Sequence, residues 1–168
     1  MSEKQGDVVY TPDWVAQDMV EHFAPTGVVL DPCAGAGAFL RQLPDGSPWC
    51  EIEAGRDFFT WTTHVDWVIG NPPYSRTRDW FRHSYDIADH LCYLVPLRNV
   101  FSGYGFVREI HDFGGIRAIR VYGTGGRLGF PMGNAVGAFH IERAYTGPTA
   151  FTLYDTPAAD ATLFEASA

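Results

Sequence analysis

The tetrapeptide Asn71-Pro72-Pro73-Tyr74 follows the apolar run Trp67-Val68-Ile69 and constrains the chain more than any other segment. Proline cannot donate the backbone hydrogen bond that a central strand requires, so a buried strand must end near Gly70 and leave the sheet there. The prolines also stiffen the turn and direct its carbonyl groups outward. We therefore predict a strand at 65–70 followed by a rigid loop that carries an amide and an aromatic ring.

This loop carries the groups that would bind an exocyclic amine. The side-chain oxygen of Asn71 and the carbonyl of Pro72 can accept the two hydrogens of an amino group, and the ring of Tyr74 can stack on a heterocycle. The alternative is an ordinary polar turn, because Asn-Pro and Pro-Pro are common turn dipeptides.

A second turn, at residues 31–39, also follows an apolar strand. The strand ends in Asp31, and Gly35 and Gly37 would let a ligand approach the backbone closely. The spacing departs from the dinucleotide fingerprint Gly-x-Gly-x-x-Gly, because apolar residues fill the region of the third glycine. A carboxylate at the end of the strand suits a cationic amino group better than a phosphate, which argues against a nucleoside triphosphate.

Together the two turns resemble those of the small phage-type adenine-N6 DNA methyltransferases, S-adenosylmethionine-dependent enzymes of the class I fold. Residues 31–39 resemble the family's cofactor loop, and residues 71–74 its catalytic loop. Residues 10–12 are similar to its N-terminal cofactor motif, residues 50–53 to the end of its second strand, and residues 55–59 to the adjacent adenine-binding motif. The motifs occur in the family's order between about residues 10 and 145.

The resemblance implies two sets of site residues. The implied catalytic residues are Asn71, Pro72, Pro73 and Tyr74. The implied cofactor-binding residues are Tyr10, Thr11, Pro12, Asp31, Pro32, Cys33, Ala34, Gly35, Gly37, Glu51, Asp57, Phe58 and Asn71.

Within the cofactor set, the resemblance also implies individual roles. Asp31 would face the methionine amino group, Glu51 the ribose hydroxyls and Asp57 the adenine amine. Glu53 is an alternative ribose ligand, because the register of a strand end is uncertain by a residue or two. Core packing is the alternative role for Phe58.

The implied reaction is methyl transfer from S-adenosylmethionine to the N6 amine of adenine in DNA, with low sequence specificity. Such a transfer depends more on positioning than on acid–base chemistry, so no histidine or carboxylate base is expected. Three alternatives stay open at this point. These are adenine methylation in RNA, methylation of glutamine side chains in proteins, and a module that binds its ligand without catalysis.

The charge distribution bears on the partner. The chain has a net charge of −8, which disfavours a polyanionic partner. Residues 1–66 carry three basic and eleven acidic side chains, whereas residues 67–147 carry nine basic and six acidic ones. We therefore expect a local basic face after the catalytic loop that can steer a nucleic acid. The alternative is that these arginines are ordinary solvated charges.

Composition favours an intracellular protein without a metal site. No apolar run is long enough to cross a membrane, and the polar N-terminus lacks a signal-peptide core, so we expect a cytoplasmic protein that interacts with no membrane. A phage-type enzyme would be virus-encoded and act in a host cell. The three cysteines have no paired spacing, so we expect neither zinc nor a disulfide. Five histidines are expected at the surface or in packing positions, namely His64, His83, His90, His111 and His140.

Hydrophobic periodicity predicts alternating helices and strands, which is typical of a doubly wound, Rossmann-like α/β sheet. By resemblance this sheet is a class I methyltransferase sheet, mostly parallel with an antiparallel final strand. We expect helices at 12–23, 36–43, 77–88 and 104–112, and strands at 28–31, 49–53, 65–70, 91–95, 116–122 and 135–145.

The chain is predicted to form a single domain over residues 1–168, with a core at 10–147 and a packed-on or frayed tail at 148–168. The short gap before residue 65 leaves no room for a full third strand of the standard sheet. No segment is large enough for a separate target-recognition domain, so a glycine-rich stretch at 123–134 and residues 75–82 are the substitutes. The residues expected to contact substrate are Ser75, Arg76, Arg78, Arg127 and Phe130. A mobile connection is the alternative for the glycine-rich stretch.

Overall fold

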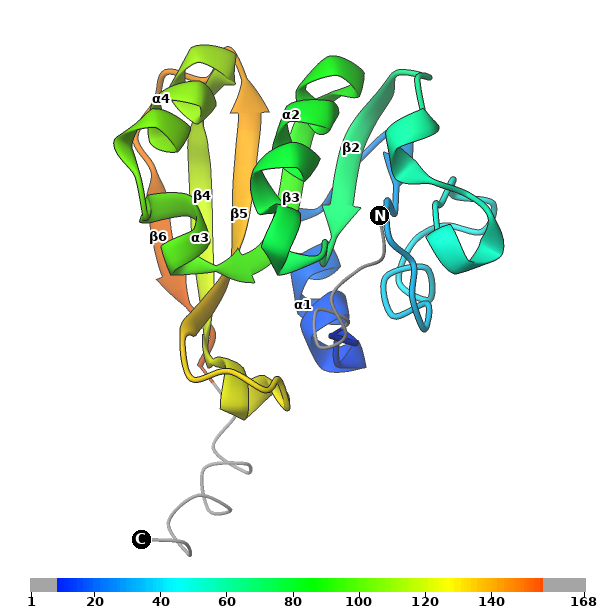
Figure 1. Cartoon of the computed structure of the whole chain (residues 1–168), viewed down its shortest axis with the longest axis horizontal. Helices are drawn as coiled ribbons and strands as arrows, with labels where there is room; N and C mark the ends of the chain where they lie inside the picture. The colour runs from blue at the N-terminus through cyan, green and yellow to red at the C-terminus, as the bar shows by residue number, and fades with distance from the viewer. Residues whose placement is uncertain (1–8, 156–168) are drawn as a thin grey trace, which may run out of the picture.

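Six strands form one mixed sheet in the order β1-β2-β3-β5-β4-β6 (Figure 1). The computed structural model describes residues 9–155. β5 is antiparallel to both of its neighbours, and the other pairs are parallel. The strands are β1 (Val29–Leu30), β2 (Val65–Gly70), β3 (Ala88–Pro96), β4 (Gly114–Thr124), β5 (Ala135–Arg143) and β6 (Ala150–Leu153).

Helices cover both faces of the sheet. One face packs against α2, α3 and α4, and the other packs against α1 (Figure 1). The helices are α1 (Asp13–Phe23), α2 (Thr77–Ile87), α3 (Leu97–Phe101) and α4 (Tyr104–Phe113). The predicted doubly wound α/β fold with its antiparallel strand is therefore confirmed.

Strand residues alternate between the two cores. On β3, Leu91, Tyr93 and Val95 pack toward α2 and its neighbouring helices. Cys92 and Leu94 pack toward α1 instead. All five side chains are fully buried, as expected for a central strand covered on both faces.

The predicted helix at 36–43 and strand at 49–53 are wrong. Residues 35–42 form overlapping turns, because Gly35 and Gly37 have positive φ angles of 49° and 80° that interrupt a helix. In the second region only isolated bridges form, Asp31 with Trp49 and Glu51 with Arg56. Within the described residues no strand lies between these bridges and β2, which agrees with the expected reduction of the third strand.

Two elements were not predicted. The short helix α3 follows β3 directly, and β6 adds an edge strand parallel to β4. β6 lies inside the stretch that was predicted as a packed-on or frayed tail, and the rest of that tail, residues 156–168, lies outside the described residues. Among residues 9–155, no helix is long and apolar enough to span a membrane.

A half-buried ion pair holds α1 against the sheet. The Asp18 carboxylate on α1 accepts two hydrogen bonds from Arg120 on β4, at 2.6 and 2.8 Å, and a third from the Tyr122 hydroxyl at 2.7 Å. The ion-paired side chains are 16% and 18% exposed, so solvent screens this pair less than it screens a surface pair. The contact fixes where α1 begins and therefore where the N-terminal segment lies.

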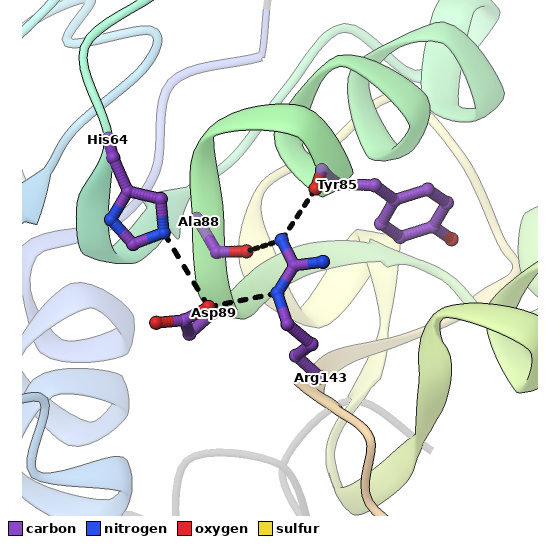
Figure 2. Close-up of polar contacts among 5 residues, drawn as sticks. All are labelled: His64, Tyr85, Ala88, Asp89 and Arg143. Carbon is purple, nitrogen blue, oxygen red and sulfur yellow. Dashed lines mark hydrogen bonds and ion pairs between the residues drawn. The ribbon is translucent and has the colours of Figure 1, made fainter.

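Arg143 supports the point where α2 passes into β3 without a loop, between Ile87 and Ala88 (Figure 2). Its guanidinium donates to the carbonyls of Tyr85 and Ala88 at 2.7 and 2.8 Å, and to Asp89 at 2.9 Å. These bonds satisfy carbonyl groups at the end of the helix that have no partner within it.

We expect Arg143→Ala to lower the free energy of unfolding by about 1–2 kcal/mol, because three charge-assisted hydrogen bonds are lost at a partly exposed site. The free energy of unfolding of Arg143→Lys should lie between those of the natural chain and Arg143→Ala. The lysine ammonium lacks the planar guanidinium that reaches all three acceptors. Urea denaturation measures both. The control is Arg108→Ala, which removes an exposed arginine paired with Asp112 and should lower stability much less than Arg143→Ala. Equal effects at the two arginines would contradict the assigned role.

Candidate functional site

Two predicted loops meet at the carboxyl edge of the parallel strands. β1 leads into Asp31 and β2 ends at Gly70, so both turns lie at the same edge of the sheet (Figure 1). A Cβ atom on Gly70 would lie 3.0 Å from Pro32 and 3.4 Å from the Cys33 sulfur. These distances are shorter than most Cβ contacts, so a larger residue at position 70 would push Pro32 and Cys33 away from β2. Gly70 is thus a site residue that the sequence analysis treated only as a strand end.

The N-terminal segment completes the junction of the loops. The Asn71 amide nitrogen donates to the carbonyl of Val9 at 3.0 Å. The Tyr10 ring lies beside Gly35, 3.6 Å from where a Cβ atom would stand. Thr11 is half-buried, and Pro12 precedes the first turn of α1. The structure therefore brings residues 9–12, the glycine turn and residues 71–74 together.

The Asn71 side chain is held with its oxygen available. Val9 fixes the amide nitrogen, whereas the side-chain oxygen is buried and has no hydrogen-bond partner among residues 9–155. Pro72 beside it is buried and Pro73 half-buried, which fixes the backbone of the turn. A buried acceptor without a partner is unfavourable unless a ligand supplies the missing donor.

The main chain of Tyr74 is held by two side chains beyond the loop. Its carbonyl accepts hydrogen bonds from the Asn99 amide and the Thr77 hydroxyl, both at 2.9 Å. The ring is half-buried and its centroid lies 6.5 Å from that of Phe130. Asn99 lies in α3, just after β3, and acts as a positioning residue that the sequence analysis missed. A polar residue directly after a buried strand was the available signal.

Asp31 is a fully buried carboxylate. One of its oxygens accepts from the backbone N–H of Cys33 at 3.2 Å, and the other has no partner within the described part of the chain. Burial raises the pKa of Asp31 from 3.8 to about 7, and the nearby Glu51 carboxylate adds to the shift. A cationic group at the second oxygen would favour the ionised form.

Cys33 serves as a packing residue in this turn. Burial and the neighbouring Asp31 carboxylate hold the pKa of its thiol well above the usual range. A thiol in that state is a poor nucleophile at neutral pH. Ala34 binds the next segment through its N–H, which donates to the carbonyl of Cys50 at 2.9 Å.

Glu51 connects the glycine turn to the reduced second strand. Its carboxylate accepts from the N–H of Gly35 at 2.7 Å and from the N–H of Glu53 at 3.2 Å. Glu53, the alternative ribose ligand, has an exposed side chain one turn further on. Of the two acids, Glu51 is the one that contacts the glycine turn.

Asp57 and Phe58 differ in how accessible their side chains are to a ligand. Asp57 is half-buried and accepts from the N–H of Phe59 at 3.0 Å. Phe58 is 2% exposed, and its ring stacks on Trp80 with centroids 4.6 Å apart. This is a core position, so a contact between the Phe58 ring and a ligand stays a prediction.

The residues expected to contact substrate lie around Tyr74 but differ in exposure. Ser75 and Arg76 are exposed in the 3₁₀ helix Tyr74–Arg76 just before α2, and Arg78 is exposed in the first turn of α2. Arg127 is exposed in a second short 3₁₀ helix, Gly125–Leu128. Phe130 is only 4% exposed, and its N–H donates to the carbonyl of Gly125 at 2.8 Å. The ring therefore anchors the glycine-rich stretch to the core. Its direct contact with a base stays a prediction.

Several solved structures with a similar fold are described as methyltransferases or as modification subunits of restriction enzymes. A Listeria monocytogenes protein described as a class I S-adenosylmethionine-dependent methyltransferase aligns with a TM-score of 0.69, over 98% of this chain and 72% of its own, at 14% identity. The M protein of the type I restriction enzyme EcoKI aligns with a TM-score of 0.61, over 92% of this chain and 50% of its own, at 13% identity. A Pyrococcus horikoshii protein described as an RNA methyltransferase gives 0.57, over 85% of this chain and 91% of its own, at 14% identity.

The fold is that of class I methyltransferases. No protein-family model and no curated protein sequence matches the chain. At these identities the likeness establishes the architecture alone, and the chain spans half the length of the EcoKI protein.

We expect Asp31→Asn to stabilise the ligand-free protein at pH 8 and to lose this advantage as the pH falls toward 4. The folded-state pKa of about 7 exceeds the ordinary 3.8, so the folded protein keeps a proton that the unfolded chain releases in this window. Stability therefore falls as the pH rises from about 4 to 7, and an amide removes that penalty.

Urea denaturation at pH 5 and pH 8 measures this effect. The exposed Asp45 provides the control, because Asp45→Asn should leave the pH dependence unchanged. The stability difference between Asp31→Asn and the natural chain should change between the two pH values. The same difference at both would contradict the raised pKa of Asp31.

Proposed function

We propose that the chain transfers a methyl group from S-adenosylmethionine to the exocyclic N6 amine of adenine in DNA. The observation that carries the proposal is the buried side-chain oxygen of Asn71. It has no partner among the described residues, its amide is fixed by Val9, and it lies on the loop beside Pro72 and Tyr74. An acceptor held in this way suits a substrate that donates an N–H.

The residues at the carboxyl edge fit S-adenosylmethionine. The unpartnered oxygen of Asp31 suits the cationic amino group of a methionine moiety, and the positive φ angles of Gly35 and Gly37 leave room above the turn. Tyr10, Thr11 and Pro12 would close the methionine end, Glu51 would take the ribose, and Asp57 the adenine amine. S-adenosylmethionine supplies a methyl group on a sulfonium, which is already a good leaving group.

The chain's own residues would then position the target amine. The lone pair of adenine N6 is delocalised into the ring, so the nitrogen is a weak nucleophile. When Asn71 and the carbonyl of Pro72 accept its two hydrogens, the nitrogen can become pyramidal and direct its lone pair at the methyl carbon. The N–C bond forms as the C–S bond breaks, and a proton then leaves the nitrogen for water. Tyr74 would stack on the base, which in duplex DNA must first leave the helix.

Exposed arginines on the segments that follow the catalytic loop support a nucleic-acid partner. Arg76, Arg78 and Arg127 are at the surface and can contact phosphates. Within residues 9–155 every strand belongs to the one sheet, which supports the proposal that the chain has no separate recognition domain. We therefore propose low sequence specificity.

Identification of the methylated product tests the reaction. The protein would be incubated with labelled S-adenosylmethionine and, separately, with duplex DNA, single-stranded DNA, RNA and a mixture of proteins, and the products digested to nucleosides or amino acids. N6-methyladenine from DNA supports the proposal. Label found only in RNA adenine or in protein glutamine would show that the substrate is RNA or protein instead of DNA. No label in any fraction would contradict the proposal that the chain is a methyltransferase.

We expect Asn71→Ala to lower the rate of transfer by at least about 100-fold, because the acceptor that positions the amine is lost. Cofactor affinity, measured by calorimetry, should stay within a few-fold of the natural chain. Substantial activity retained in a folded Asn71→Ala protein would exclude the role given to this residue.

Asp31→Asn should mainly change cofactor affinity, in contrast to Asn71→Ala, which should mainly change the rate of transfer. We expect it to weaken binding of S-adenosylmethionine by at least about tenfold, because a charged partner of the amino group becomes neutral. Calorimetric titration of the variant beside Asp45→Asn measures the difference. Unchanged affinity would remove Asp31 from the binding site without affecting the role of Asn71.

A further inference from the structure

Three potential metal ligands lie side by side on β3 and β5, away from the loops described above. In the antiparallel register His90 pairs directly with Glu142, and His140 stands two residues before Glu142 on the same strand. Side chains at directly opposed positions, and at every second position along a strand, share one face of the sheet. The three residues therefore form one cluster on the face covered by α1.

The donor atoms have the spacing of a metal site. Nδ1 of His90 and Nε2 of His140 are 3.2 Å apart, and one ligand atom from each of the three residues lies within 4.8 Å of the others. Zinc binds histidine nitrogen at about 2.0–2.1 Å, which places two nitrogens of a tetrahedral site about 3.3 Å apart. Two imidazoles and a carboxylate are a ligand set found in open zinc sites.

The two imidazoles differ in their exposure to solvent. His140 is 5% exposed, whereas His90 is half-buried. Zinc binds neutral imidazole through a ring nitrogen, and both rings lie beside the cleft.

Packing orients the two rings toward one another. Trp67 on β2 stacks on His90 with centroids 4.4 Å apart and on His140 with centroids 4.6 Å apart. The cluster lines a cleft of about 400 Å³, so an ion can reach it from solvent. Rings held in this way lose little freedom when they bind an ion.

Arg117 competes for the same carboxylate. Its guanidinium donates to one oxygen of Glu142 at 2.6 Å, and it also lines the cleft. A guanidinium at this place repels a cation and withholds one carboxylate oxygen. Removal of this charge should therefore strengthen the binding of a metal ion.

We propose that His90, His140 and Glu142 bind a divalent transition-metal ion of the zinc type. The site departs from the sequence analysis, which expected no metal and placed His90 and His140 among packing or surface residues. It lies in the amino-terminal half of β3, whereas Asp31 and Asn71 lie at the carboxyl edge. The ion would cross-link β3 to β5, independently of methyl transfer.

Titration of the chelator-treated full chain with Zn²⁺ tests the site. We expect one ion per chain by calorimetry and a rise in Tm with Zn²⁺ concentration, because the folded state alone has the site assembled. His90→Gln and Glu142→Gln, both at partly exposed positions, should each weaken binding by at least about tenfold. His64→Gln provides the matched control, since His64 is exposed and belongs to no such cluster among the described residues.

Arg117→Gln should bind Zn²⁺ more tightly than the natural chain, by at least about threefold, which neither a disrupted fold nor adventitious surface binding would produce. The absence of saturable binding by the natural chain would overturn the proposal. Binding that is equally strong in His90→Gln, Glu142→Gln and His64→Gln would overturn it too.

Discussion

The contact between Gly70 and the turn at Asp31–Cys33 is the constraint on which the candidate site depends. Parallel pairing of β1 with β2 brings two loops to one edge of the sheet. The missing side chain at Gly70 lets Pro32 and Cys33 approach the backbone of β2 directly. The carboxylate of Asp31 and the amide of Asn71 consequently lie on adjoining loops, each held by the main chain.

This arrangement is unfavourable for the ligand-free protein. Asp31 and Asn71 each keep a buried oxygen that no other described residue satisfies. Such groups lower stability, and binding sites are where proteins retain them. A ligand with one cationic amine and a target with one neutral amine would supply the two missing donors. The backbone N–H of Cys33 and the carbonyl of Val9 hold the two side chains in place.

The sheet was predictable from local patterns, and the contacts of the site were not. The β2 bounds at 65–70 follow from an apolar run closed by two prolines, and α1 follows from helical spacing after Pro12. The turns at 35–42 were mistaken for a helix, because their apolar residues have helical spacing while the glycines adopt angles that a sequence does not state. β6 forms by pairing with the free edge of β4, about thirty residues earlier in the chain, and a local sequence pattern does not reveal such a partner.

The same limit applies to side chains. Val9 holds Asn71 across 62 residues, and His90 meets His140 across 50. Neither pair has a spacing that a motif could reveal. Phe58 and Phe59 are adjacent and chemically identical, and only the stacking of Phe58 on Trp80 decides which one is buried. The sequence could suggest a ligand class only where several functional groups lie in one loop, as at residues 71–74.

The position of β5 has a consequence for how the chain acquires its structure. β5 lies between β3 and β4, although it is the last of the three in sequence. Until residues 135–143 are synthesised, β3 and β4 cannot be joined, and each presents an edge of unpaired backbone groups. The pairing of β3 with β5 then closes over a long sequence separation, which slows folding and prolongs the exposure of the β3 edge. During synthesis on the ribosome, the nascent chain is therefore most vulnerable to association just before β5 is available to pair with β3 and β4.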